Sequence, residues 1–188
     1  MKITQSFTVA AAPGRVWSLF QDVPTIARCM PGATLGDRTA SGTHTGTLTV
    51  RLGPMTASFQ GEAQVTADAV SRTGTMIGSG VDRGAGSRGR VELGYRLTGE
   101  GEATRVEIDA DVTLTGAAAQ FGRPALIDEM AKRIVADFSA CLEAVLGAPD
   151  PSAASQIVAD EVRGVRLLLA GLWGAFTRFL SRLTRRGA

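Results

Sequence analysis

The chain has 188 residues, of which 44% are hydrophobic and 20% charged, so one folded domain with an appendage is expected and a disordered or collagen-like protein is excluded. Two cysteines exclude a disulfide scaffold, and a single histidine, His44, leaves no zinc-ligand repeat and one imidazole for any catalytic triad. The formal charge of +2 is unevenly divided: residues 1–159 carry 14 Lys or Arg against 16 Asp or Glu, a net of −2, whereas residues 163–188 hold six arginines and no acid. The opening sequence MKITQSFTV lacks the apolar core of a signal peptide, which predicts a cytoplasmic protein.

Alternation of apolar and polar residues dominates the first 115 positions and predicts β-strands. It is clearest over residues 106–115 and recurs over residues 3–9, 48–52, 55–65 and 91–97. Turn residues bound these runs, and Gly53-Pro54 and Gly99-Glu100-Gly101 are typical of hairpin connections. The pattern predicts one antiparallel sheet of six or seven strands with a solvated face.

Helical spacing appears in three segments. Pro13 opens a short amphipathic helix, a second short helix is expected over residues 25–30, and a long one over residues 118–146. A long helix lying across a curved antiparallel sheet is an α+β helix-grip arrangement, which can leave an apolar cavity between sheet and helix. We therefore predict a ligand-binding domain over residues 1–147.

Large, adaptable apolar side chains are the candidates for lining such a cavity, because they can adjust to a flexible apolar ligand. Ordinary core packing is the alternative for each of them. The candidates are Trp17, Phe20, Met55, Phe59, Met76, Tyr95, Phe121, Met130, Ile134 and Phe138.

Two features that could indicate chemistry have simpler interpretations. Residues 84–89, GAGSRG, match a dinucleotide-binding fingerprint, but the strand-like RVELGYRL that follows is not the helix which that site requires. The glycines, with Gly78 and Gly80, indicate a β connection and could widen the interior. His44 is expected at a strand start, facing solvent, and with Tyr95 it is the least implausible acid or base.

The cysteines and one acidic stripe also point to structure. Cys29 and Cys141 lie on apolar helical faces and are expected to be buried, inert thiols. Glu107, Asp109 and Asp111 share one strand face and are expected on a solvated outer surface, without a metal. No catalytic or metal site is therefore predicted.

The last segment follows a linker over residues 148–156 and has helical spacing over residues 157–188. Its apolar stretch is broken by Arg178, which argues against a membrane span. We expect an amphipathic helix on an anionic membrane surface; packing onto the domain or another copy is the alternative, and a nucleic-acid role is weaker. The residues predicted to bind the membrane are Arg163, Arg166, Leu169, Leu172, Trp173, Phe176, Arg178, Phe179, Leu180, Arg182, Leu183, Arg185 and Arg186.

Three stretches carry a family resemblance. They are FTVAAAPGRVWSLFQD at residues 7–22, RCMPG at residues 28–32 and VTLTGAAAQFGR at residues 112–123, with the glycine-rich strand at residues 78–89 between them. In this order they resemble the CoxG family of carbon monoxide dehydrogenase subunits over residues 1–147. The resemblance implies a helix-grip fold of the SRPBCC superfamily, whose members mostly hold hydrophobic molecules under the long helix.

The resemblance also implies partners. Members of the family are associated with molybdenum hydroxylases such as carbon monoxide dehydrogenase, and are thought to attach the enzyme to the membrane or connect it with the quinone pool. The resulting hypothesis is a non-catalytic carrier of a lipophilic ligand, a respiratory quinone or other lipid, that docks on the inner membrane face. The alternatives are a membrane tether without ligand and, less favoured, an enzyme acting on a hydrophobic substrate.

Overall fold

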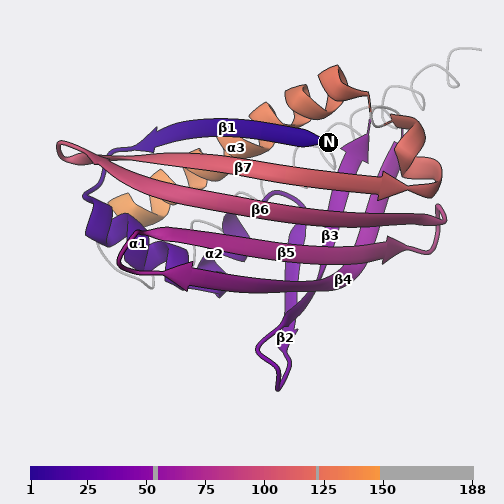
Figure 1. Ribbon diagram of the computed structural model, residues 1–188, viewed down its shortest axis with the longest axis horizontal. Helices are drawn as coiled ribbons and strands as arrows, with labels where there is room; N and C mark the ends of the chain where they lie inside the picture. Colours follow the sequence, from indigo (N-terminus) through magenta and orange to yellow (C-terminus); the bar gives the residue numbers. More distant parts are fainter. Residues whose placement is uncertain (53–54, 122, 149–188) are drawn as a thin grey trace, which may run out of the picture. The chain divides into compact units, whose positions relative to one another are not determined.

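A computed structural model describes residues 1–52, 55–121 and 123–148 (Figure 1). The chain divides into two compact units, Met1–Leu146 and Gly147–Ala188. Residues 149–188 lie outside the described residues, and with them the whole predicted membrane-binding helix and nearly all of the linker. The fold of the first unit is described below.

Seven strands form one antiparallel sheet in the order β1-β7-β6-β5-β4-β3-β2, which confirms the predicted sheet. Their bounds are β1 (Lys2–Val9), β2 (Ala33–Arg38), β3 (His44–Leu52), β4 (Met55–Asp68), β5 (Thr73–Asp82), β6 (Ser87–Glu100) and β7 (Ala103–Thr115). Residues 84–89 lie across the β5–β6 connection and the start of β6, so the strand interpretation of GAGSRG is confirmed. Gly101, with a φ of 65°, turns the chain between β6 and β7, while Gly53-Pro54 lies outside the described residues.

Three α-helices accompany the sheet: α1 (Pro13–Gln21), α2 (Val23–Cys29) and α3 (Pro124–Gly147). Asp22 caps α2, since its carboxylate accepts hydrogen bonds from the backbone N–H of Thr25 at 3.3 Å and from its hydroxyl at 2.6 Å. The long helix was expected to begin at Ala118, but a separate 3-10 helix, η1 (Gly116–Phe121), precedes it. Proline favours the first turn of a helix and disfavours helical backbone in the residue before it, so α3 starts at Pro124.

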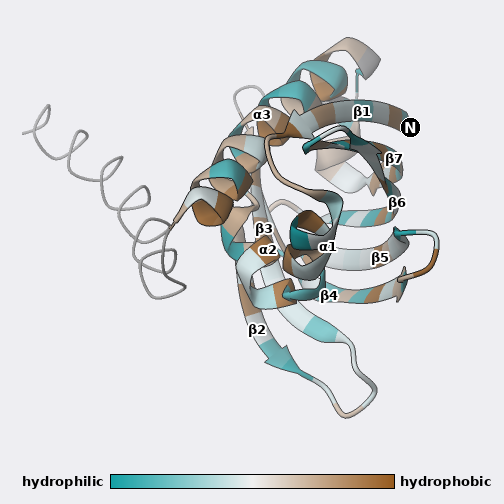
Figure 2. Ribbon diagram, turned by 90° about the vertical axis from the view of Figure 1, so that its left-hand side faces the viewer, coloured by the Kyte–Doolittle hydropathy of each residue, from teal (hydrophilic) through white to brown (hydrophobic). Residues whose placement is uncertain are grey.

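Helix α3 lies along one face of the sheet, and α1 and α2 lie near its C-terminal end (Figures 1 and 2). The ring of Phe138 on α3 meets that of Phe7 on β1 edge-on, with centroids 6.0 Å apart. The Gln5 side chain on β1 donates to the Asp128 carboxylate of α3 at 3.1 Å. At the other end of the helix, Arg15 of α1 donates to the Leu146 carbonyl at 2.7 Å. The face of the sheet that holds Phe7 is therefore the inner face.

The register explains what the inward glycines do. Gly61, Gly80 and Gly89 form one row across β4, β5 and β6. A Cβ atom at Gly80 would lie 3.1 Å from the Cβ of Phe59, and one at Gly89 would lie 3.4 Å from its Cε1. At these two positions the glycines let the Phe59 side chain lie close against the sheet, so the expected widening of the interior is partly taken up by that side chain.

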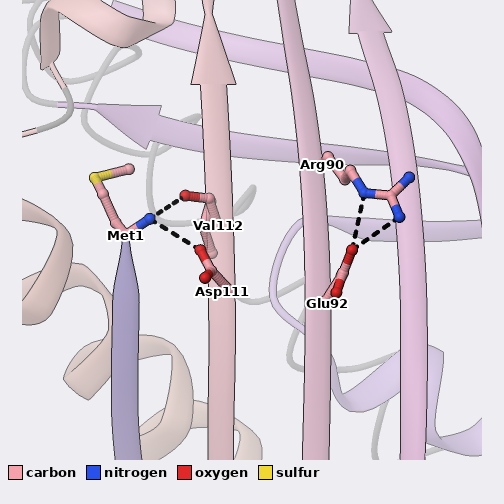
Figure 3. A network of polar contacts seen from close by, with 5 residues as sticks. All are labelled: Met1, Arg90, Glu92, Asp111 and Val112. Atoms are coloured by element: carbon pink, nitrogen blue, oxygen red, sulfur yellow. Dashed lines mark hydrogen bonds and ion pairs between the residues drawn. The ribbon is translucent and has the colours of Figure 1, made fainter.

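The outer face of the sheet is polar and hydrogen-bonded. The Arg90 guanidinium pairs with the Glu92 carboxylate at 2.8 Å, and the N-terminal amine of Met1 donates to Asp111 at 3.1 Å (Figure 3). Asp109 accepts a hydrogen bond from the Thr4 hydroxyl at 2.7 Å. The acidic stripe of β7 is therefore an outer surface, as predicted. Within the described ranges no group of His, Cys, Asp and Glu has the arrangement of a metal site.

Asp82 holds the connection between β5 and β6. Its carboxylate accepts hydrogen bonds from the backbone N–H of Ala85 at 3.1 Å and of Ser58 at 3.0 Å, and these hold the pKa of Asp82 below its ordinary value of 3.8. Because the folded pKa is lowered, the ionised side chain adds stability above pH 3.8, and this contribution is lost as the pH falls through the folded pKa.

We therefore expect Asp82→Asn to lower the free energy of unfolding at neutral pH and to have a diminishing effect as the medium becomes more acidic than the ordinary pKa of the carboxyl. Denaturant titrations of both proteins at neutral and acidic pH measure this difference. Glu62→Gln, on the outer surface of neighbouring β4, is the control and should change little. An Asp82→Asn penalty of the same size at both pH values would contradict this role for the ionised carboxylate.

Candidate functional site

The space between the sheet and α3 is tightly packed at both ends. At one end the buried residues come from β3, β4, η1 and α3, and they are Leu52, Ala57, Phe59, Ala118 and Ile127. At the other end they come from β1, α1, β6, β7 and α3, and they are Val9, Val16, Phe20, Leu97, Val106, Phe138 and Leu142. These two groups form the hydrophobic core.

Between these ends the inward side chains are only half-buried. Val65, Met76 and Leu93 lie side by side on β4, β5 and β6, and each remains half-buried. Met130 and Ile134 of α3 are also half-buried, although Ile127 and Phe138 on the same helical face are buried. We call Val65, Met76, Leu93, Met130 and Ile134 the central band. It is an apolar surface that a lipophilic ligand could remove from water.

An aromatic group adjoins the central band. Tyr95 lies two residues beyond Leu93 on β6, so both side chains share the inner face. The Tyr95 ring lies 5.1 Å from the Phe20 ring and 6.5 Å from the Trp17 ring, both of α1. Phe20 in turn lies 6.4 Å from Phe138 of α3. Helix α1 thus brings two rings from the start of the chain to the inner face of β6.

The Tyr95 hydroxyl is the unusual polar group of this interior. It is buried, and no hydrogen-bond partner for it occurs among the described residues. The side chain lies over Gly74 of β5, where any Cβ atom would collide with the end of the ring. Burial raises the pKa of Tyr95 above its ordinary value of 10.0, and the nearby Gln21 side chain offsets part of this rise. The hydroxyl is therefore neutral, protonated and able to donate throughout the physiological pH range.

The structure separates the predicted cavity residues into groups. Met55, Phe59 and Met130 are in or against the β3–β4 core cluster. The aromatic group holds four more, Trp17, Phe20, Tyr95 and Phe138. Met76 and Ile134 are in the central band with Met130, and the Phe121 side chain lies outside the described residues. Whether these residues line a ligand cavity stays a prediction.

Sequence reasoning missed several residues of the site. Val65 and Leu93 appeared in the strand alternation but were not selected as ligand contacts, and Phe7 was not linked to the aromatic group. Their signal was the inward phase of each strand, combined with the register that joins the strands. The alternation alone could not show which inward positions remain half-buried.

Two hollows lie on the outer face of the sheet. One, of about 600 Å³, is lined mainly by outward residues such as Thr45, Glu62 and Arg90. The other, of about 510 Å³, is lined mainly by residues such as Lys2 and Asp109. Neither is the apolar cavity predicted between the sheet and α3, so that cavity also stays a prediction.

The two cysteines form a disulfide, which corrects the prediction of free thiols. Cys29 ends α2, Cys141 lies near the end of α3, and their Cα atoms are 5.4 Å apart. Both residues are buried, as expected. They are separated by 112 positions, and only the fold brings them together. The bond ties α2 to the helix that covers the central band.

His44 is placed differently from the sequence-based expectation. It begins β3, as predicted, but it is half-buried and its register partner is Ala63, whose position belongs to the inner face of β4. The side chain therefore does not simply face solvent. Among the helices of the described segments, none has the length and apolar character needed to cross a membrane.

Comparisons with known proteins agree with this architecture. A model of the CoxG family of carbon monoxide dehydrogenase subunits matches residues 6–147. No curated protein sequence matches the chain.

Several solved structures share the fold. A conserved protein of Geobacillus kaustophilus is similar with a TM-score of 0.64 and 17% identity, over 73% of this chain and 90% of that one. A START superfamily protein of Mycobacterium smegmatis is similar with a TM-score of 0.50 and 14% identity, over 76% and 94%. The di-domain ARO/CYC BexL from the BE-7585A biosynthetic pathway is similar with a TM-score of 0.55 and 11% identity, over 79% and 48%. At these identities the likeness shows the fold alone, and that fold is the predicted helix-grip.

Proposed function

The chain belongs to the CoxG family of carbon monoxide dehydrogenase subunits, and from that premise we propose that it binds a lipophilic molecule, a respiratory quinone, between its sheet and α3. In this proposal it carries the quinone between the membrane and a molybdenum hydroxylase of the carbon monoxide dehydrogenase type. The family's description as a subunit of that enzyme supports the choice of partner. We propose no chemical step on the protein itself, so its part in electron transfer is delivery.

The central band is the observation that carries the proposal. Its apolar side chains face α3 and yet stay half-buried, whereas the residues at both ends of α3 are buried. Burying apolar surface stabilises a complex by about 25 cal/mol per Å². An apolar ring and chain lying along Val65, Met76 and Leu93 would gain this stabilisation, and α3 would cover it through Met130 and Ile134.

The arginine-rich tail would supply membrane docking at the inner face of the cell membrane. Each basic residue near an anionic leaflet contributes about 1 kcal/mol, and apolar side chains that enter the interface add to this. Residues 163–188 carry six arginines and no acid, which suits this surface. Disulfides are rare in a reducing cytoplasm, but burial of both cysteines would slow exchange of this one with soluble thiols.

Vesicle binding by the full chain tests the docking step. We expect a variant with Arg178→Glu, Arg182→Glu and Arg185→Glu to lose flotation with anionic vesicles, since each reversal replaces attraction by repulsion. The matched control reverses three exposed arginines of the folded domain, Arg51, Arg83 and Arg96, and so has the same net charge. The control should still float; equal loss in both variants would show that overall charge, and not the tail, holds the protein on the membrane.

Transfer of ligand separates the carrier from a simple tether. The full chain is mixed with vesicles that contain quinone, released by salt and freed of vesicles. A carrier retains about one quinone per chain. Chain that binds the vesicles and leaves them without quinone would favour the tether.

A further inference from the structure

The Tyr95 hydroxyl is a buried donor that the fold itself does not use. Buried polar groups in proteins nearly always have a hydrogen-bond partner, and leaving one without a partner is costly. No such partner for this hydroxyl occurs within the described ranges. The cost is tolerated where a bound molecule completes the hydrogen bond.

The position of the hydroxyl suits a ligand in the central band. Tyr95 and Leu93 share the inner face of β6, and their register partners on β5 are Gly74 and Met76. Because Gly74 has no side chain, the end of the Tyr95 ring lies directly over the β5 backbone, beside Met76. The donor is therefore at the edge of the central band.

The surroundings restrict what can meet this hydroxyl. The rings of Phe20 and Trp17 lie on the α1 side, with centroids 5.1 Å and 6.5 Å from that of Tyr95. Aromatic neighbours at these distances favour a flat apolar ring. They supply neither a second charge nor a strong acceptor, so a partner for the hydroxyl must bring its own acceptor oxygen.

We propose that Tyr95 anchors the polar end of the ligand by donating a hydrogen bond from its hydroxyl to a carbonyl oxygen on an otherwise apolar ring. The ring lies beside Phe20 and Trp17, and the apolar chain of the ligand extends along Met76 and Leu93. This inference rests on the proposed function, and it adds an orientation: the carbonyl end lies toward α1. Tyr95 is a specificity residue here, because it distinguishes a carbonyl-bearing ring from a hydrocarbon of the same shape.

Tyr95→Phe tests the anchor, because it removes the hydroxyl and keeps the ring. Two probes are titrated into the full chain: a naphthoquinone with an isoprenoid chain, and the naphthalene with the same chain. We expect the substitution to weaken binding of the quinone about tenfold, the effect of one good hydrogen bond, and to leave binding of the hydrocarbon unchanged. Affinity of the original chain should also be constant from mildly acidic to mildly alkaline pH, since the phenol stays protonated.

The unfolding of ligand-free protein gives a second readout. A hydroxyl without a partner contributes nothing that phenylalanine lacks, so Tyr95→Phe should be at least as stable as the original chain. A less stable variant would show that the hydroxyl has a partner within the protein and would overturn the proposal. Unchanged quinone binding would also overturn it, as would equal weakening for both probes. Failure of both probes to bind the original chain would instead remove the proposed function.

Discussion

Loss of the Cys29–Cys141 disulfide is expected to lower the free energy of unfolding by about 4 kcal/mol. The bond closes a loop of 112 residues, and a loop of that length restricts the unfolded chain strongly. It also fixes the end of α2 to α3 close to Leu142, which is fully buried. The double variant Cys29→Ser, Cys141→Ser should therefore unfold at a much lower denaturant concentration than the oxidised protein.

Reduction supplies the control for that experiment. A dithiol reductant should destabilise the original chain by a similar amount and should leave the double variant unchanged, because the variant has no bond to break. Thiol titration of the denatured, unreduced protein should find no free cysteine. Free thiols in that titration, or equal stability of the oxidised protein and the double variant, would contradict the disulfide.

Filling the central band should remove ligand binding while preserving the fold. Met76→Trp places a larger side chain among Val65, Leu93 and Ile134, where the half-buried surroundings leave it room. A ligand that must share this space meets an overlap of about 1 to 3 kcal/mol, so quinone affinity should fall about tenfold to a hundredfold. Titration of quinone into both proteins measures the change.

Ile77→Trp is the matched control for that variant. Ile77 is the next residue of β5, points to the outer face and is 46% exposed, so the same substitution there should leave quinone affinity unchanged. If the interior were a filled core, Met76→Trp would instead cost about 1 to 3 kcal/mol of stability through overpacking. A folded Met76→Trp protein with full affinity would show that the ligand binds elsewhere.

Local patterns were sufficient to predict most of the fold. The run from Val106 to Thr115 alternates because one face of β7 packs inward and the other meets solvent, and this inward face is where α3 lies. Pro13 marked the start of α1 because its backbone conformation suits the first turn of a helix. The same rule applied to Pro124 would have corrected the start of the long helix, which was placed too early at Ala118.

Long-range geometry decided the remainder. Cys29 and Cys141 each have the pattern of a buried helical position, and nothing local indicates that the two helices meet. Tyr95 was selected as a large inward side chain, but its missing hydrogen-bond partner depends on where α1 places Phe20 and Trp17. Burial along α3 likewise depends on the curvature of the sheet, which the alternation does not encode.

Native mass spectrometry of the full chain, purified without detergent and then mixed with quinone, tests the central claim most directly. We predict a species heavier than the bare chain by the mass of one quinone, and loss of that species in Met76→Trp but not in Ile77→Trp. A chain that keeps its bare mass with quinone in excess, while remaining folded, would contradict ligand binding between the sheet and α3.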